Sequence, residues 1–294
     1  MPGVKGGGEL TVTWTVREVL NWTRGYFEDA GIVQPRLEAE TLLAYVLRVD
    51  RLHLYVSPDQ PLTPEEREGY RTAIQSRRSG TPLQHLIGEM PFLGLRFRVG
   101  PQALIPRPET EELVEKVLRL APREREISCL DLGTGCGVIA VSLARYLPRA
   151  RVTAVDLSPQ ALTLARENAA LNGVLERISF LESDWTSALD GASFDLVVSN
   201  PPYIPRQEIA GLATEVRDHE PRMALDGGED GTGEIARIAR GLSGRLRSGG
   251  AVLLEIGDGQ GATVVAHLAQ TGFSGAVVER DLAGKERFVI ARCP

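Results

Sequence analysis

The chain has 294 residues, of which 43% are hydrophobic, and a formal net charge of −6 at pH 7. This length and apolar content suit two domains or one large α/β domain, and no apolar run reaches the roughly 20 residues of a membrane span. The acidic balance argues against non-specific nucleic-acid binding, which depends on lysine and arginine. Because the three cysteines and four histidines are scattered, we expect a reducing cytoplasm, no disulfide framework and no metal site.

The N-terminal part predicts a flexible leader followed by a helical domain. Residues 1–11 are rich in glycine and contain no apolar signal segment. Residues 12–80 predict helices without strands. A first amphipathic helix ends at Gly31, a second opens at Pro35, and a third begins at the capping box Thr63-Pro64-Glu65-Glu66. We expect a small N-terminal helical domain over this region.

The remainder of the chain predicts an α/β domain. Residues 81–108 form a linker whose alternating segment, 90–99, predicts a β-hairpin. Over residues 109–294, strands alternate with helices, so we expect a mostly parallel sheet with helices on both faces. The last two strands predict an antiparallel hairpin at the edge of this sheet. The expected strands are 127–130, 152–155, 178–181, 194–199, 251–256, 276–278 and 288–290.

A glycine-rich loop separates the first of these strands from a helix. The run "LDLGTGCGVIAVSLA" places Gly133, Gly135 and Gly137 at this turn, where glycine permits φ > 0 and lets a ligand approach the backbone. A tight strand-to-helix turn without a ligand is the alternative. A dinucleotide fingerprint would require a small third residue at position 138, which is valine here. The tighter spacing favours a ligand without a pyrophosphate.

Acidic residues follow the next two strands. Asp156 ends the second strand, where a carboxylate can accept both hydroxyls of a ribose; helix capping is the alternative, and Ser158 already serves it. After the third strand, Asp184 offers an acceptor for an exocyclic amine and Trp185 an apolar face for a purine. Acidic loop residues that are merely solvated remain the alternative reading there. The three loops together predict a ligand crevice at the carboxyl ends of the strands.

In this order, "DLGTGCG", "AVD" and "SDW" resemble the S-adenosylmethionine site of class I methyltransferases. The resemblance implies a Rossmann-like class I methyltransferase sheet with S-adenosylmethionine as the cofactor. It assigns the glycine loop to the methionine portion, Asp156 to the ribose and the loop after the third strand to adenine. The residues implied in cofactor binding are Gly133, Thr134, Gly135, Cys136, Gly137, Asp156, Asp184, Trp185 and Asn200.

The fourth strand stops on "NPPY", residues 200–203, although prolines cannot continue a central strand. The run resembles the motif with which methyltransferases act on planar nitrogen. In that role Asn200 and the Pro201 carbonyl each accept one N–H of the target nitrogen, while Tyr203 packs against the planar group. Pro202 completes the substrate-binding motif. The geometry would be preorganised rather than acid–base catalytic. A rigid extended linker is the alternative interpretation.

Flanking sequence favours one substrate among the planar nitrogens. Residues 81–115, with the core "IPRPETE", resemble bacterial release factor glutamine-N5 methyltransferases of the HemK/PrmC type, as do "EPRMALDGGEDG" and "LLEIG". The resemblance implies the glutamine of the Gly-Gly-Gln loop in class I peptide chain release factors as substrate, with Arg107 as active-site support. The helical domain would dock the release factor. The alternatives are an N-methyltransferase of DNA or RNA bases and a non-catalytic S-adenosylmethionine-binding module.

Overall fold

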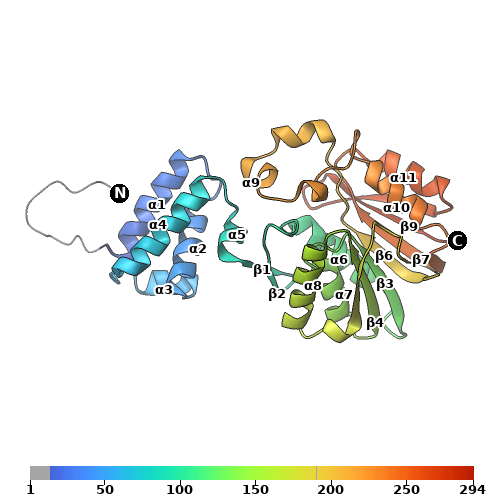
Figure 1. Ribbon diagram of the computed structural model, residues 1–294, viewed down its shortest axis with the longest axis horizontal. Helices are drawn as coiled ribbons and strands as arrows, with labels where there is room; N and C mark the ends of the chain where they lie inside the picture. Colours follow the sequence, from blue (N-terminus) through green and yellow to red (C-terminus); the bar gives the residue numbers. More distant parts are fainter. Residues whose placement is uncertain (1–13, 190) are drawn as a thin grey trace, which may run out of the picture. The chain divides into compact units, whose positions relative to one another are not determined.

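The computed structural model describes residues 14–189 and 191–294, which divide into two compact units between Ile87 and Gly88 (Figure 1). The leader expected over residues 1–11 lies outside the described residues. No helix within the described ranges is both long and apolar enough to cross a membrane. The two units are described separately below.

The first unit is built of helices, as the sequence predicts. Two of them begin at capping boxes: Thr15 and Thr63 each accept the backbone N–H three residues on, and a glutamate at that position bonds back. Gly31 has φ +73° just after the first helix, which explains why that helix stops there. The helices are α1 (Val16–Asp29), α2 (Pro35–Leu47), α3 (Arg51–Val56), α4 (Pro64–Arg78) and α5 (Leu83–Ile87).

An apolar cluster forms the core of this helical unit. Val19 and Phe27 of α1 pack with Leu42 and Leu43 of α2. Tyr70 of α4 is also buried, and its hydroxyl donates to the carbonyl oxygen of Ala39 at 3.0 Å. A buried tyrosine needs such a partner, because an unpaired hydroxyl in the interior is costly. Helix α5 lies in the segment that we expected to be a linker.

The second unit begins with the predicted hairpin. Strands β1 (Glu89–Phe92) and β2 (Leu95–Arg98) pair antiparallel across a turn at Leu93 and Gly94, both with positive φ. Helix α6 (Pro108–Leu120) follows, with proline at its first turn. Its buried face joins the core of the sheet.

A seven-stranded sheet organises the second unit, in the order β5-β4-β3-β6-β7-β9-β8. The first five strands in this order are parallel, and β9 and β8 form the predicted antiparallel edge hairpin. From β3 the chain builds outward to β5, then returns to add β6 on the other side of β3. The carboxyl ends of β3 and β6 therefore flank a topological switch point, where open α/β sheets bind ligands. The strands are β3 (Ile127–Leu132), β4 (Ala150–Asp156), β5 (Ile178–Glu182), β6 (Phe194–Ser199), β7 (Leu246–Glu255), β8 (Ser274–Arg280) and β9 (Glu286–Arg292).

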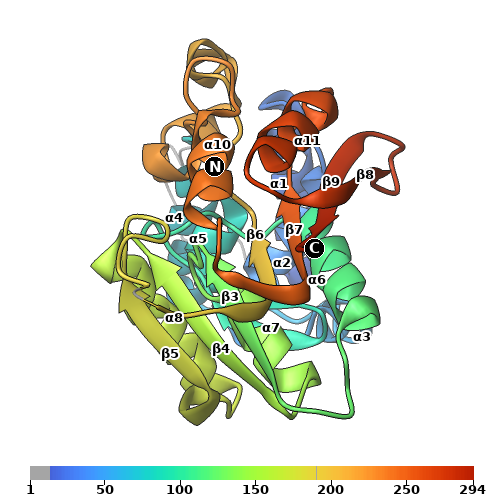
Figure 2. The ribbon, with the colours of Figure 1, turned by 90° about the vertical axis from the view of Figure 1, so that its right-hand side faces the viewer.

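Helices cover both faces of this sheet (Figure 2). Alternate strand residues point to opposite faces, so Cys129 lies in one apolar cluster and Leu130 in the other. The first cluster includes α6, α7 (Val138–Tyr146) and α8 (Pro159–Leu171). The second includes α10 (Gly233–Gly241) and α11 (Gly261–Gln270). The sequence predicted α7 and α8 but gave no specific expectation for α10 and α11.

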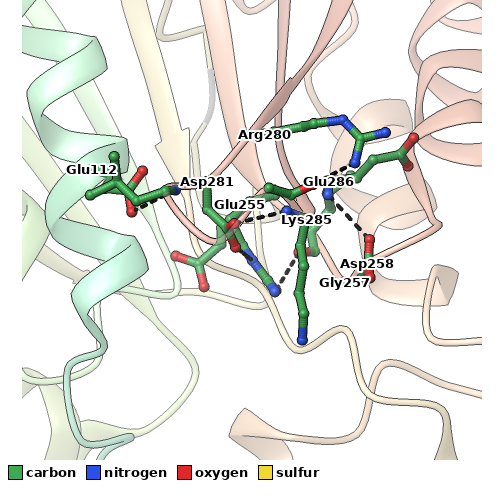
Figure 3. A network of polar contacts seen from close by, with 12 residues as sticks. Glu112, Glu255, Gly257, Asp258, Arg280, Asp281, Lys285 and Glu286 are labelled. Carbon is green, nitrogen blue, oxygen red and sulfur yellow. Dashed lines mark hydrogen bonds and ion pairs between the residues drawn. The ribbon is translucent and has the colours of Figure 1, made fainter.

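Polar contacts fix the turn between β8 and β9 (Figure 3). Asp281 accepts the backbone N–H of Lys285 at 2.9 Å and pairs with Arg287 at 3.2 Å. The backbone N–H of Glu286 donates to Asp258, in the loop after β7, at 3.1 Å. The edge hairpin is thus tied to the carboxyl end of β7.

Candidate active site

A cavity of about 350 Å³ opens at the carboxyl ends of β3, β4, β5 and β6, within the second unit. Nine of the residues singled out from the sequence line it: Gly133, Thr134, Gly135, Cys136, Asp156, Asp184, Trp185, Asn200 and Pro202. Gly137, Pro201, Tyr203 and Arg107 are described but do not line this cavity. The fold therefore gathers the three predicted loops and the start of "NPPY" around one space.

Backbone conformation explains the glycine loop. Gly133, Gly135 and Gly137 have φ of +71°, +56° and +88°, which disfavour any residue with a Cβ. A Cβ on Gly137 would also lie 3.0 Å from the Cβ of Ala165, so this glycine serves close packing between α7 and α8. Gly133 and Gly135 instead line the cavity. Two glycines thus leave backbone open to a ligand, and the third is structural.

Asp131 fixes the glycine loop through two hydrogen bonds. Its Oδ2 accepts the hydroxyl of Thr134 at 2.6 Å and the backbone N–H of Ala140 at 3.0 Å. Burial raises the pKa of this carboxyl to about 7, against the opposing effect of these two hydrogen bonds. Asp131 is fully buried and does not line the cavity, so it stabilises the loop rather than contacting a ligand.

Asp156 lies at the cavity wall and is held by backbone donors. Its Oδ2 accepts the N–H of Gly135 at 2.8 Å and its Oδ1 the N–H of Ser158 at 2.9 Å. Burial raises its pKa, and both N–H groups oppose that shift by stabilising the carboxylate. Ser158 caps α8 through its own hydroxyl, at 3.2 Å from the N–H of Ala161. The helix therefore does not need Asp156 as its cap.

The loop after β5 is anchored to α10. The indole N–H of Trp185 donates to Glu234 at 2.6 Å, and the residue adopts φ +51°. A Cβ on Gly133 would lie 3.2 Å from this ring, so the indole lies against the glycine loop. Asp184 pairs with Arg237 at 2.6 Å. Its carboxylate is therefore already engaged by a cation at the cavity, an interaction that the sequence did not reveal.

Asn200 comes next to the glycine loop because β3 and β6 are neighbours. Leu132 and Ser199, the last residues of these strands, are register partners, and the Ser199 hydroxyl donates to the Leu132 carbonyl at 2.6 Å. The next residue on each strand is Gly133 and Asn200. The Asn200 Nδ2 donates to the hydroxyl of Thr110 at 3.0 Å. No hydrogen bond from the described residues reaches its Oδ1, which is left as an acceptor.

Tyr203 is held beside the motif by a buried carboxylate. Its hydroxyl donates to Glu255 at 3.2 Å, and its carbonyl oxygen accepts from Gln260 at 2.9 Å. Burial raises the pKa of Glu255 to about 7, and its hydrogen bond from Thr110 and the charge of Arg287 oppose the shift. The Arg287 guanidinium also lies 5.9 Å from the centre of the Tyr203 ring. The Tyr203 side chain is therefore fixed by Glu255 at the end of β7.

Arg107 is paired with a second buried carboxylate. Its guanidinium donates to Glu220 at 2.5 Å, and Glu220 also accepts the backbone N–H of Ile105 at 3.2 Å. The side chain of Glu220 is 1% exposed. The "IPRPETE" and "EPRMALDGGEDG" segments are thus joined at the rim, where Pro106 and Pro221 line the cavity.

Several site residues were not assigned from the sequence. Thr110 and Glu255 lie inside segments that carried the family resemblance, yet no local pattern indicates that they meet. Glu234 and Arg237, on α10, line the cavity and contact the loop after β5. Within residues 14–189 and 191–294, no group of three or more His, Cys, Asp or Glu side chains could hold a metal ion.

Two family models match this chain. "PrmC N-terminal domain" matches residues 18–88, and "Methyltransferase small domain" matches residues 110–228. Among solved structures, a methyltransferase from Pyrococcus furiosus is 18% identical, with a TM-score of 0.51 over 68% of this chain and 89% of its own. That likeness concerns the fold alone.

Curated relatives are similar over nearly the whole chain. The release factor glutamine methyltransferase of Geobacter sulfurreducens is 44% identical over 279 residues, 95% of this chain and 97% of its own. The enzyme of the same name from Moorella thermoacetica is 43% identical over 94% of this chain and 98% of its own. Such similarity extends through the helical unit as well as the sheet. The chain belongs to the release factor glutamine methyltransferase family.

Proposed function

We propose that this protein transfers a methyl group from S-adenosylmethionine to the side-chain nitrogen N5 of the glutamine in the Gly-Gly-Gln loop of class I peptide chain release factors. The observation that carries the proposal is the pairing of Leu132 with Ser199, which brings Gly133 of the glycine loop and Asn200 to adjacent strand ends. Family membership supports the choice of substrate. We expect the reaction in the cytoplasm.

We infer that this cavity holds S-adenosylmethionine. Gly133 and Gly135 expose backbone at the cavity, and a Cβ on either would carry the strain of a positive φ. Asp156 keeps lone pairs for ribose hydroxyls beyond the two that its backbone donors occupy. Trp185 offers its ring for adenine, and we infer that Asp184 acts there together with Arg237. When bound, S-adenosylmethionine supplies an electrophilic methyl group on a sulfonium.

Asn200 and Pro201 are the proposed catalytic acceptors. An amide nitrogen is a poor nucleophile because its lone pair is delocalised. The Oδ1 of Asn200 and the carbonyl oxygen of Pro201 would each take one N–H of the glutamine amide and hold its nitrogen in place. Such positioning lowers the barrier without a side-chain base, and the proton that the nitrogen loses on methylation passes to solvent.

The remaining motif residues have supporting roles in this proposal. The Tyr203 hydroxyl donates to Glu255, so we propose that Tyr203 fixes the motif. Arg107 would act by holding the rim segment that contains Glu220 and Pro221. The helical unit would dock the folded release factor, because one glutamine side chain offers too little surface to be selected among all cellular glutamines.

Mass spectrometry of an intact release factor, after incubation with the enzyme and S-adenosylmethionine, tests this function. We expect one added methyl group, located by fragmentation on the glutamine of the Gly-Gly-Gln loop. A release factor with asparagine in place of that glutamine is the matched control and should remain unmodified. Methylation of added transfer RNA or DNA in place of the release factor would favour the nucleic-acid alternative and overturn the proposal.

A further inference from the structure

Two consecutive hydrogen bonds connect the side chain of Asn200 to a buried carboxylate. Its Nδ2 donates to Thr110 Oγ1 at 3.0 Å, and Thr110 Oγ1 donates to Glu255 Oε2 at 2.8 Å. Thr110 is 2% exposed and Glu255 is not exposed. The three residues come from the first turn of α6, the end of β6 and the end of β7. Residues far apart in the chain thus converge on one amide.

The direction of these two hydrogen bonds follows from the chemistry of Glu255. When Glu255 is ionised, its carboxylate can only accept hydrogen bonds, so Thr110 donates its single hydroxyl proton to Glu255, as the structure shows. Thr110 Oγ1 then has only a lone pair to offer Asn200, so it accepts a hydrogen bond from that side chain. The Asn200 amide must therefore turn its NH2 group to Thr110 and its Oδ1 to the opposite side.

We propose that Thr110 is a positioning residue which, backed by Glu255, selects the orientation of the Asn200 amide that the methyl transfer requires. This inference rests on the proposed function. In the opposite orientation, the Asn200 NH2 would face the N–H groups of the target amide, and one acceptor would be lost. Glu255 also accepts the Tyr203 hydroxyl, so one carboxylate fixes both ends of the "NPPY" motif.

A purely structural role makes different predictions. The contact between Thr110 and Glu255 also joins α6 to β7, so its loss could lower stability without touching Asn200. Thr110 lines the cavity too, and a direct contact with substrate would not depend on Asn200. Only a positioning role requires that the effect of Thr110 disappear once Asn200 is removed.

A double-mutant cycle in the full chain separates these roles. The variants are Thr110→Val, Asn200→Ala and both together, with Thr110→Ser as the conservative rescue. We expect Thr110→Val to lower kcat roughly tenfold, as for loss of one hydrogen bond. The Kd for S-adenosylmethionine, measured by calorimetry, should stay within about twofold. Thr110→Ser should restore kcat, and Thr110→Val should change kcat less than about twofold when Asn200 is already alanine.

Two further variants control for folding and test the role of Glu255. Ser142→Ala removes another fully buried hydroxyl, on α7 and away from the cavity, and should leave kcat unchanged. Glu255→Gln preserves volume, but its NH2 group can donate to Thr110. The Thr110 hydroxyl is then free to donate to Asn200 and to turn the amide over. We expect kcat to fall in this variant as well. The Glu255→Gln variant tests the positioning role of Thr110 if Thr110→Val does not fold.

A spectroscopic measurement tests the orientation without any release factor. In nitrogen-15 spectra of the full chain, the side-chain amide signal of Asn200 is identified by its loss in Asn200→Ala. We expect the amide proton that bonds Thr110 to be protected from solvent exchange, and the protection to be lost in Thr110→Val and kept in Thr110→Ser. Absence of this protection in the unaltered protein, or equal loss of kcat by Thr110→Val with and without Asn200, would overturn the inference. Failure of the proposed function would instead appear as an unmodified release factor with the amide protected.

Discussion

Asp156 Oδ2 accepts the backbone N–H of Gly135 at 2.8 Å, so the carboxyl end of β4 is fastened to the glycine loop that follows β3. The same carboxylate takes the N–H of Ser158 through its other oxygen. Two parts of the proposed cofactor site, the loop for the methionine portion and the acid for the ribose, are therefore one hydrogen-bonded unit. Loss of the Asp156 hydrogen bonds should weaken cofactor binding more than it slows catalysis.

Asp156→Ala is expected to weaken binding of S-adenosylmethionine by roughly 1.5–3 kcal/mol, the range for hydrogen bonds to a charged group. Isothermal titration calorimetry measures the change. Asp258→Ala is the matched control, since Asp258 also follows a strand of this sheet and accepts a backbone N–H, yet it does not line the cavity.

A 2′-deoxy analogue of S-adenosylmethionine separates the ribose contact from the loop contact. The unaltered protein should bind the analogue more weakly than the parent compound, and Asp156→Ala should bind the two alike. If the folded variant still distinguished them as the unaltered protein does, Asp156 would not be the ribose acceptor.

Asn200→Ala is expected to lower kcat about 100-fold or more, as when one preorganised polar group is lost from a site. Affinity for S-adenosylmethionine should be largely retained, because the proposed cofactor site also includes the loops after β3, β4 and β5. Single-turnover methylation of a release factor, together with calorimetry, checks both parts. A variant that kept most of its turnover would show that Asn200 does not orient the nitrogen.

The exposed apolar side chains of α3 offer a test of docking by the helical unit. Leu52 and Val56 are one helical turn apart and are 71% and 73% exposed. If they contact the release factor, the double variant Leu52→Asp, Val56→Asp should raise KM for the intact factor roughly tenfold or more. Methylation of a short Gly-Gly-Gln peptide should not change.

Leu282→Asp is the control for that double variant. Leu282 is 93% exposed and belongs to the second unit. Its replacement therefore tests the effect of losing an exposed apolar side chain outside the helical unit. Steady-state kinetics with intact factor and with peptide compare the three proteins. An unchanged KM for the factor in the double variant would remove α3 from the docking surface.

The buried carboxyl of Glu255 predicts a pH dependence of stability. Its pKa in the folded protein is raised to about 7, mainly by burial, while Thr110, Tyr203 and Arg287 oppose the shift and the charge of Glu109 adds to it. From its ordinary value of 4.5 up to about 7, the folded state therefore binds more protons at this group than the unfolded state does. Its contribution to the free energy of unfolding then falls as pH rises through this interval.

Glu255→Gln removes that titration. The free energy of unfolding of the variant, minus that of the unaltered protein, should increase between pH 4.5 and 7 by an amount on the order of 3 kcal/mol. Urea titrations at several pH values give this difference, in which the contribution of Asp131 cancels. Glu115→Gln, at a side chain that is 53% exposed, is the control for removing a carboxylate. A pH-independent difference for Glu255→Gln would contradict the prediction.

Local sequence patterns were sufficient for the strands of this fold and for nine of the residues that line the cavity. Glycines between a strand and a helix, an acid at the end of the next strand and a proline pair after a fourth strand each reflect short-range constraints on φ, on hydrogen bonding and on chain direction. The predicted strands and edge hairpin were confirmed in the sheet. The family could be identified for the same reason, since its motifs are contiguous in the chain.

Tertiary structure alone decided which side chains support that cavity from behind. Thr110 and Glu255 are separated by 145 positions, and Trp185 and Glu234 by 49, so no local periodicity relates them. Their contacts arise because the strand order places β6 between β3 and β7 and because α6 and α10 cover opposite faces of the sheet. A buried acceptor such as Glu255 meets its donors only after the sheet has assembled, because hydrogen bonds of this kind depend on distance and direction in space and leave no spacing in the chain.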